Sequence, residues 1–370
     1  MMKEQPALPY TRHCVSEADI ACVVKCLREG DLATGRVVEE YEEAFAAFHG
    51  YRYGVAVNSG TSALWCALRV LDLPPGAEVV TSPLTFVATP NMIRLSGGKA
   101  VFADVDAQSF NLTRGSVQRV MTGQTRAVLS VDYGGMLCGL SGLGLPLVSD
   151  ACHSVGIRDT VSGPWLRCFS THAAKNITTG EGGMACTDDP GVADRLRSLR
   201  SHGIPGGYRT RQGHGHAQEE LGFNFRLTDP QAALGLSQLG RLEEFMLRRR
   251  ALVGRYTRGL EHQPGIMLRN YNQPSAHHLY VVLVDTDRIR HDRDWVWEKL
   301  REAGVGVNVH YAPAYWFKPY REAGYEGALC PNAEWVWERA ITLPLYYGLT
   351  DSDVDWVVEM LLGVVEGDLA

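Results

Sequence analysis

The sequence predicts an α/β protein in which a large domain, with a mainly parallel sheet between helices, precedes a small C-terminal α+β domain. A chain of 370 residues is too long for one small core and suits a large domain with a smaller companion. Strand-like and helix-like segments alternate through most of the first half, which is the pattern of a parallel sheet. Later, a long helical stretch leads into a shorter mixture of strands and helices.

Seven short runs have the length and apolar content of strands. They lie at 53–58, 78–82, 100–105, 127–132, 145–151, 167–171 and 182–188. Helical spacing of apolar residues follows the first run at Ala63–Leu71 and recurs at Pro90–Leu95 and Val192–Leu199. We therefore expect a seven-stranded, mainly parallel sheet with helices on both of its faces.

An almost continuous helical pattern from Asp229 to about Leu260 marks the change of domain. Thr228 can cap its start, and Pro230 suits the first turn of a helix. The elements expected beyond it are a strand at 277–285, a helix at 294–304, a strand at 305–310 and helices at Asn332–Ala340 and Asp351–Val365. We therefore place a large domain at residues 1–245 and a small domain at residues 246–370.

Composition argues against several classes of protein. The net charge of −6, without a long basic block, gives no sign of a surface for nucleic acid or membrane. Asp355 and Glu359 interrupt the apolar stretch near the C-terminus, and the first residues lack the apolar core of a signal peptide. The nine cysteines show no CxxC spacing, so we expect reduced thiols in a cytoplasmic protein.

The segment from Phe169 to Gly183 carries the most distinctive chemistry. Lys175 follows the end of an expected strand and precedes a glycine-rich turn into the next strand. Ligands collect at the strand ends of open α/β sheets, and a partly desolvated lysine there can have a lowered pKa and act as an amine nucleophile. By spacing alone, a solvated loop lysine is the commoner outcome.

Asp150 and His153 lie at the end of an earlier apolar strand. A carboxylate there is costly without a cationic or donor partner, and a protonated pyridine nitrogen of a cofactor is one such partner. A helix cap or a salt bridge would satisfy Asp150 equally well. His153 could pack on the cofactor ring or hydrogen-bond its phenolic oxygen, and a structural histidine is the equal alternative.

The stretch Asn58–Ala63 lies between a strand and a helix. Free backbone amides at a helix start, with small hydroxyl side chains beside them, form a site for phosphate. An ordinary helix cap has the same kind of sequence. Neither a GxGxxG fingerprint nor a P-loop is present elsewhere.

Taken in order, these segments give the chain its resemblance to a known family. Over about residues 8–361 it resembles the sugar aminotransferases of the DegT/DnrJ/StrS family, which are fold-type I pyridoxal-phosphate (PLP) enzymes. The matching stretches are NSGTSAL, TSPLTFVATPNMI, FADVD, the Lys175 segment, RSHGI, GFNFRLTDPQAALGLSQL, GVNVHY and ITLPLYYGLT. The His-x-x-Lys sequence at 172–175 is similar to the branch that acts on UDP-linked 4-keto sugars.

The resemblance implies cofactor roles for matching positions. Lys175 would hold PLP as a Schiff base, and Asp150 would pair with the pyridine nitrogen. Phe86 matches an aromatic residue that stacks on the ring, although a core aromatic is the plain alternative. The remaining implied cofactor contacts are His153 beside the ring and Gly60, Thr61 and Ser170 at the phosphate.

Other matching positions imply a substrate side and a partner subunit. His172, His310 and Tyr311 match motifs near the substrate, although strand-end packing would also explain the last two. Asn224 matches an asparagine that reaches the phosphate bound by the neighbouring subunit. The resemblance therefore implies a homodimer with shared active sites.

The chain also departs from the family pattern. The segments 132–150 and 153–169 are shorter than usual, and Thr171 stands where phenylalanine is common. The pair His214 and His216 invites a metal interpretation, but neither HExxH nor a recognised ligand spacing accompanies it. By resemblance this pair lies in a mobile loop near the active site, and we expect no metal.

The resulting hypothesis is a ping-pong transamination from L-glutamate to a nucleotide-linked keto sugar, at C4 of a UDP-4-keto-deoxysugar. A 3-keto sugar or a cyclitol as acceptor would use the same lysine chemistry. A PLP-dependent sugar dehydratase is a second alternative, but those relatives carry histidine in place of Lys175. A PLP-binding sensor without turnover is the third.

Overall fold

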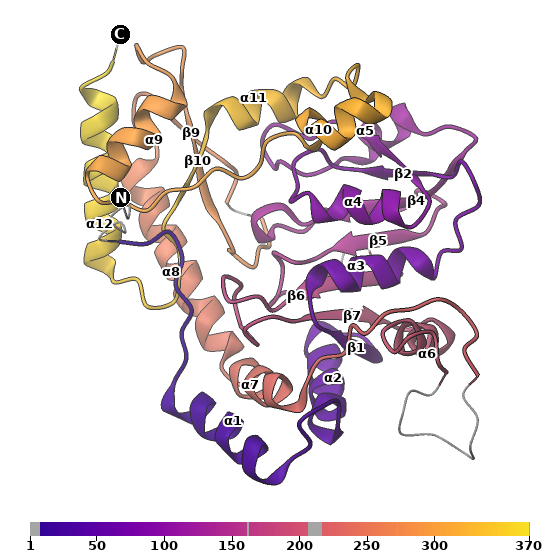
Figure 1. Cartoon of the computed structure of the whole chain (residues 1–370). Helices are drawn as coiled ribbons and strands as arrows, with labels where there is room; N and C mark the ends of the chain where they lie inside the picture. The colour runs from indigo at the N-terminus through magenta and orange to yellow at the C-terminus, as the bar shows by residue number, and fades with distance from the viewer. Residues whose placement is uncertain (1–7, 161–162, 206–216, 272, 370) are drawn as a thin grey trace.

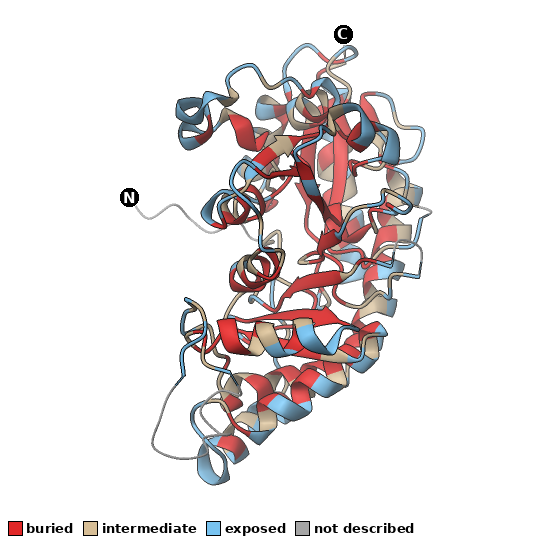
Figure 2. Ribbon diagram, turned by 90° about the vertical axis from the view of Figure 1, so that its right-hand side faces the viewer, coloured by how far each residue is buried: buried red, intermediate tan, exposed pale blue. Residues whose placement is uncertain are grey.

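The computed structural model describes residues 8–160, 163–205, 217–271 and 273–369. A seven-stranded sheet and a three-stranded sheet organise this part of the chain. Helix α8 (Leu242–Leu260) runs along the side of the molecule between them (Figure 1). Buried residues concentrate in the layers between sheets and helices (Figure 2).

The large sheet has the strand order β1-β7-β6-β5-β4-β2-β3. Its strands are β1 (Tyr53–Val57), β2 (Glu78–Thr81), β3 (Lys99–Phe102), β4 (Thr125–Val131), β5 (Leu147–Asp150), β6 (Leu166–Ser170) and β7 (Gly183–Thr187). All pairings from β6 through to β3 are parallel, whereas β7 is antiparallel to both of its neighbours. The predicted seven-stranded, mainly parallel sheet is confirmed.

Helices cover both faces of this sheet because successive strand residues point to opposite sides. Val55 and Val57 of β1 pack in one cluster with α3, α4 and α6, whereas Ala56 packs in another with α2 and α7. The helices of this part are α1 (Glu17–Glu29), α2 (Arg36–His49), α3 (Gly60–Arg69), α4 (Ala88–Leu95), α5 (Arg114–Val120), α6 (Pro190–Leu199) and α7 (Asp229–Leu239).

Helix α7 begins as the sequence predicts, with a capping box between Thr228 and Gln231. The prediction of one long helix from Asp229 to Leu260 is wrong, because the chain breaks between α7 and α8. Arg241 leaves the helical conformation, with φ −107° and ψ 1°. Its guanidinium turns toward Asp19 at 3.3 Å and lies over the Phe245 ring, which supports the break.

The three-stranded sheet has the order β10-β9-β8 and is antiparallel. Its strands are β8 (Ile266–Leu268), β9 (Tyr280–Val284) and β10 (Ala340–Leu343), and the helices of this region are α9 (Arg293–Glu302), α11 (Pro331–Arg339) and α12 (Asp351–Glu366). The short elements are η1 (Tyr133–Gly135), η2 (Ala314–Trp316), α10 (Lys318–Tyr320) and η3 (Arg321–Tyr325). The helices predicted at 294–304, 332–340 and 351–365 are confirmed.

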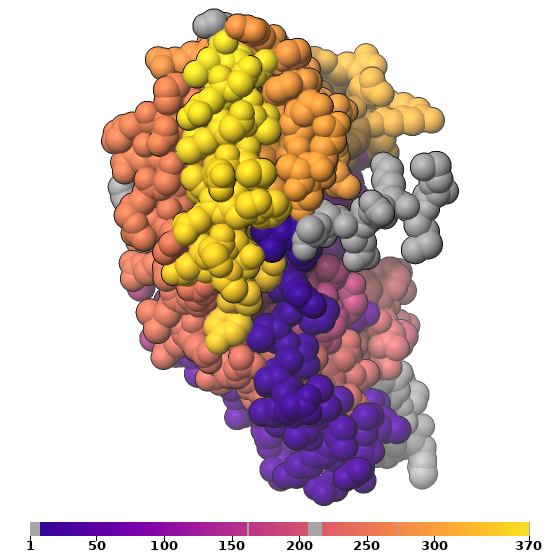
Figure 3. Space-filling view, turned by 90° about the vertical axis from the view of Figure 1, so that its left-hand side faces the viewer, coloured from indigo at the N-terminus to yellow at the C-terminus, as the bar shows by residue number. Residues whose placement is uncertain are grey.

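The strand predicted at 305–310 is wrong, because these residues form isolated bridges. Val305 pairs with Leu8 and Asn308 pairs with Thr342. The segment that precedes α1 therefore lies along the C-terminal part of the chain, where the backbone carbonyl of Tyr10 also accepts from Leu345 N–H at 3.1 Å. Figure 3 shows this segment in indigo, descending beside the yellow C-terminal helix.

Two further features bear on the sequence predictions. Residues 136–146, which join the parallel strands β4 and β5, form neither helix nor strand, in keeping with the short segment noted above.

The proposed domain boundary at residue 245 falls within α8. Phe245 packs with the large sheet and Leu252 packs with the C-terminal cluster, and the boundary itself stays a prediction.

Candidate active site

A cavity of about 1000 Å³ lies where the carboxyl ends of β1, β5 and β6 meet. Strands that run in the same direction bring the residues after them to one edge of the sheet. The predicted residues that line this cavity are Gly60, Thr61, Phe86, Asp150, His153, Ser170, His172, Lys175, His310 and Tyr311. Asn224 is exposed and is not among the lining residues.

Lys175 lies in a turn that follows β6. Its backbone N–H donates to the carbonyl of His172 at 2.9 Å, and the hydroxyls of Thr171 and Thr179 join the two ends of the turn at 2.7 Å. The neighbouring Asn176 donates to the carbonyl of Ala276 at 2.9 Å. Burial lowers the pKa of the Lys175 amine below its ordinary value of 10.5.

Asp150 is buried at the end of β5 and is held through both carboxylate oxygens. Oδ2 accepts from the hydroxyl of Thr89 at 2.6 Å, and Oδ1 accepts from the backbone N–H of Cys152 at 3.1 Å. Neither donor carries a full charge. The negative charge of Asp150 raises the pKa of the nearby Lys175 amine and so offsets part of the effect of burial.

The amino end of α3 opens into the cavity. Ser59 caps the helix by accepting from Ser62 N–H at 3.1 Å, and Asn58 accepts from the Ser62 hydroxyl at 2.7 Å. A β-carbon on Gly60 would lie 2.7 Å from Sγ of Cys152 and 2.9 Å from Cβ of Ser170. Glycine is therefore required at the start of α3, where free amides point toward the cavity.

His153 is buried in the cavity wall and contacts Tyr311, which lines the same cavity. Its Nδ1 lies 3.3 Å from the backbone N–H of Gly134, and its Nε2 lies 3.2 Å from the Tyr311 hydroxyl. Burial and the nearby Lys175 amine lower the pKa of His153 well below 6.5. Burial raises the pKa of Tyr311 well above 10, so both rings are neutral at physiological pH.

His310, His172 and Phe86 complete the predicted set. His310 is buried, shares a hydrogen bond of 2.8 Å with the Thr342 hydroxyl, and has its pKa lowered by burial to about 3. His172 is exposed, with Nε2 3.8 Å from a carboxylate oxygen of Glu181. The Phe86 side chain is 60% exposed although it lines the cavity, so its face is available to a ligand.

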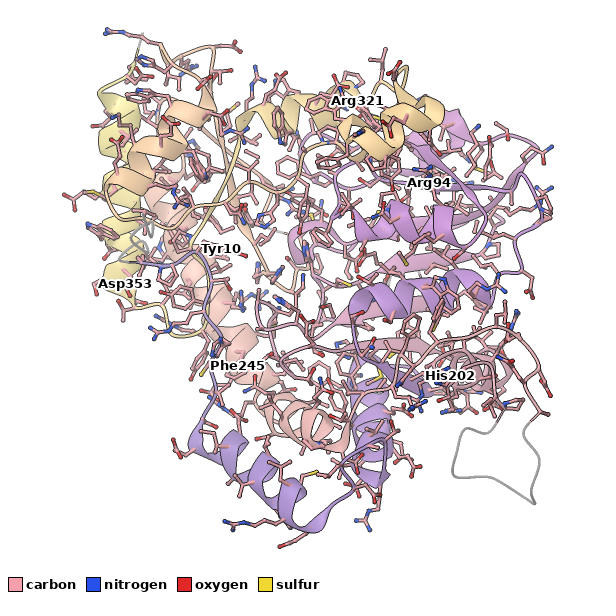
Figure 4. All side chains as sticks on the ribbon, viewed as in Figure 1. Tyr10, Arg94, His202, Phe245, Arg321 and Asp353 are labelled. Atoms are coloured by element: carbon pink, nitrogen blue, oxygen red, sulfur yellow. The ribbon has the colours of Figure 1, made fainter. Side chains whose placement is uncertain are left out.

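Some residues of the site escaped the sequence analysis. Thr89 holds Asp150, and His278 packs against the His153 ring with centroids 4.5 Å apart. Tyr10, labelled in Figure 4, reaches the cavity from the segment preceding α1 and lies 6.1 Å from the His310 ring. Hydroxyl or imidazole groups in otherwise apolar stretches were the only available signal.

Metal and membrane interpretations find no support in the described part of the chain. Within it, no three His, Cys, Asp or Glu side chains gather as potential metal ligands. His214 and His216 lie outside the described residues. Among the described helices, none combines the length and the apolar composition that a bilayer span requires.

Solved structures with the same architecture define the class of protein. PseC of Helicobacter pylori, an aminotransferase involved in the biosynthesis of pseudoaminic acid, superimposes with a TM-score of 0.90 at 28% identity, covering 97% of this chain and 99% of its own. The sugar aminotransferase Spr1654 of Streptococcus pneumoniae, described as putative, superimposes in its PLP form with a TM-score of 0.88 at 28% identity, with the same coverage. The fold is that of the fold-type I PLP-dependent sugar aminotransferases.

The sequence comparison places the chain within that class. The chain belongs to the DegT/DnrJ/EryC1/StrS aminotransferase family, whose profile matches residues 13–362. The spore coat polysaccharide biosynthesis protein SpsC of Bacillus subtilis (strain 168) is 35% identical over 393 aligned positions, covering 99% of each chain. The protein is thus a PLP-dependent sugar aminotransferase, as the sequence motifs predicted.

Proposed function

We propose that the protein transfers an amino group from L-glutamate to C4 of a UDP-linked 4-keto-deoxysugar, by ping-pong transamination. The observation that carries this proposal is the meeting of Lys175, Asp150 and the amino end of α3 around one cavity. The His-x-x-Lys sequence at 172–175, which resembles the UDP-sugar branch of the family, favours that class of substrate.

The residues of the cavity fit three groups of PLP, which are its phosphate, its pyridine nitrogen and its aldehyde. The amides at Gly60 and Thr61, with the Ser170 hydroxyl, suit a phosphate, and the absence of a β-carbon at Gly60 lets the start of α3 pack closely against Cys152 and Ser170. The carboxylate of Asp150 suits a protonated pyridine nitrogen. Lys175 suits the aldehyde, and the exposed face of Phe86 suits the flat ring.

When bound, PLP supplies an electron sink for the carbon next to the transferred nitrogen. Lys175 then acts as a proton carrier. Because burial lowers the pKa of its amine, more of this amine is unprotonated near neutral pH than for an exposed lysine. It can take a proton from the α-carbon of the donor and return it to the acceptor. Asp150 keeps the ring nitrogen charged.

The aromatic lining of the cavity suits a large acceptor. Phe317 and Trp337 are among the lining residues, and the Trp337 ring packs edge-on against Trp316, with ring centroids 4.9 Å apart. Flat aromatic surfaces of this kind can receive the base of a nucleotide. By the likeness to SpsC, a spore coat polysaccharide biosynthesis protein, we propose that the product is an amino sugar for a surface polysaccharide.

A homodimer would complete this site. Asn224 lies outside the cavity of its own chain and is flanked by Leu221 and Phe223, whose side chains are 79% and 52% exposed. An exposed apolar patch around a polar side chain is typical of an interface. We propose that this face meets a second copy and delivers Asn224 to the phosphate of the partner subunit.

We place the protein in the cytoplasm. All nine cysteines are free thiols, which agrees with a reducing compartment.

A substrate panel tests the proposal directly. The purified holoenzyme would be incubated with L-glutamate and, in turn, UDP-linked and dTDP-linked 4-keto and 3-keto sugars and a cyclitol ketone, with mass detection of the aminated product. We expect the UDP-4-keto sugar to be aminated with the highest kcat/KM. Exclusive amination of a 3-keto sugar or a cyclitol ketone would overturn the C4 assignment, and a failure of glutamate to convert the cofactor would overturn glutamate as the donor.

A further inference from the structure

The hydrogen bonds around His153 determine which of its ring nitrogens carries the proton. A backbone N–H can only donate, so the Gly134 N–H at 3.3 Å requires His153 Nδ1 to accept. This contact excludes both the imidazolium form and the tautomer protonated on Nδ1. His153 is therefore neutral and carries its single ring proton on Nε2.

The same proton sets the direction of the next hydrogen bond. Nε2 of His153 lies 3.2 Å from the Tyr311 hydroxyl, and their ring planes differ by 20°. Because Nε2 carries the proton, the Tyr311 oxygen accepts in this bond. The phenolic hydrogen of Tyr311 must then point elsewhere.

Within the described residues, His153 is the one hydrogen-bond partner of the Tyr311 hydroxyl. Tyr311 is half-buried and lines the cavity that Lys175 and Phe86 also line. Its ring lies 6.2 Å from that of Phe86. The free phenolic hydrogen is thus available to an acceptor atom of a molecule bound in the cavity.

We propose that Tyr311 is a catalytic acid, which donates its phenolic proton to the carbonyl oxygen of the keto sugar. This inference rests on the proposed function. In the acceptor half-reaction a nitrogen–carbon bond forms, the carbon–oxygen bond breaks and the oxygen leaves as water. One proton of this water comes from Tyr311 and the other from the attacking amine, whose second proton returns to Tyr311. In the donor half-reaction the nitrogen–carbon bond breaks as water adds to carbon; Tyr311 gives its proton to the departing nitrogen and takes one from the water, so the residue is restored within each half-reaction.

The bond from His153 suits this role. As the phenolic proton leaves, negative charge develops on the Tyr311 oxygen, and the N–H of His153 already points at that oxygen. Lys175 remains free to move the proton at carbon. Two proton transfers at different atoms are thus served by two different residues.

The first test examines the apo protein and needs no activity. The ¹⁵N chemical shifts of the His153 ring would be measured between about pH 6 and pH 8, with assignment by loss of the signals in the His153→Gln variant. We expect a neutral ring protonated on Nε2 throughout, and a shift of the Nε2 signal in the Tyr311→Phe variant. A ring protonated on Nδ1, or on both nitrogens, would overturn the inference.

The second test separates kcat from KM in the holoenzyme. For Tyr311→Phe we expect kcat to fall about a hundredfold in both half-reactions, with KM changed less than threefold. Tyr347→Phe is a matched control, because that hydroxyl bonds to Glu244 on the surface, and it should keep the wild-type rate. A wild-type kcat for Tyr311→Phe would overturn the inference and leave the proposed function standing. Wild-type enzyme that aminates no keto sugar would overturn both.

Discussion

The hydroxyl of Thr89 donates a hydrogen bond of 2.6 Å to Oδ2 of Asp150 and so joins α4 to the end of β5. Because that hydrogen is used, the Thr89 oxygen accepts in turn from the Thr85 hydroxyl at 2.7 Å. The other carboxylate oxygen accepts from Cys152 N–H. Asp150 is therefore fixed in one orientation by a residue of α4 and a residue of the turn that follows β5.

Replacing Thr89 by valine should misorient this carboxylate without changing the packed volume. We expect kcat to fall about tenfold to a hundredfold, since hydrogen bonds to charged groups contribute roughly 1.5–3 kcal/mol. Steady-state rates with glutamate and the preferred keto sugar would measure the loss. Thr89→Ser keeps the hydroxyl and should retain most of the rate. Equal rates for the valine variant and the wild type would show that this bond does not orient Asp150.

The Lys175→Ala variant should fold normally and lose turnover. Without the amine, the protein cannot hold the cofactor covalently, so the visible absorption band of the purified enzyme should shift to that of unattached PLP. Absorption spectra and the glutamate half-reaction would be recorded together. Normal transamination by this variant would mean that another residue is the nucleophile.

Buried neutral histidines should make the folded protein sensitive to acid. Burial lowers the pKa of His49 and of His310 to about 3, whereas an unfolded histidine titrates near 6.5. Below about pH 6.5 the unfolded chain therefore binds more protons, and stability that is present at neutral pH is lost as the pH falls toward 3. Each such histidine contributes up to about 1.4 kcal/mol per pH unit.

Urea unfolding at about pH 7.5, 6 and 5 would measure this slope. His49→Gln should make the slope shallower, whatever its effect on stability at neutral pH. His262→Gln is the control, because the side chain of His262 is 90% exposed, and it should leave the slope unchanged. A free energy of unfolding that stays constant across this range would contradict the prediction.

Two inactive variants should restore activity to each other if the active sites are shared. Subunits carrying Lys175→Ala and subunits carrying Asn224→Asp would be mixed under conditions that allow exchange. A mixed dimer has one site with a native lysine and a native partner asparagine, so about a quarter of all sites should recover after random exchange. The rate of the mixture, compared with each variant alone, is the measurement. If activity did not recover although exchange had been proven, Asn224 would act in the active site of its own subunit and not in that of its partner.

Local signals were sufficient for the large sheet and for the centre of the site. Each of the seven strands is a short apolar run, and the residues proposed for catalysis follow strands that end at one edge. Asp150 ends β5 and Lys175 lies in the turn after β6, where ligands collect in open α/β sheets, and the family resemblance supplied the role of each. The sheet's direction then brings them together, although they are 25 positions apart in the sequence.

Long-range contacts explain what the sequence did not show. Thr89 acquires its role only through Asp150, 61 positions later, and His278 bonds Asn176 across 102 positions. The break after Leu239 depends on Arg241 meeting Asp19. Residues 305–310 have the alternating pattern of a strand, yet Val305 pairs with Leu8 in an isolated bridge. No local sequence pattern predicts a pairing between residues so far apart in the chain.

The pairing of Leu8 with Val305, and of Tyr10 with Leu345, has a consequence for biosynthesis. Leu8 and Tyr10 find their partners only after some three hundred further residues have been translated. The large sheet can assemble while synthesis continues, but the wall of the cavity that Tyr10 supplies cannot be put in place before then. Competence to bind substrate should therefore appear only after Leu345 has been translated.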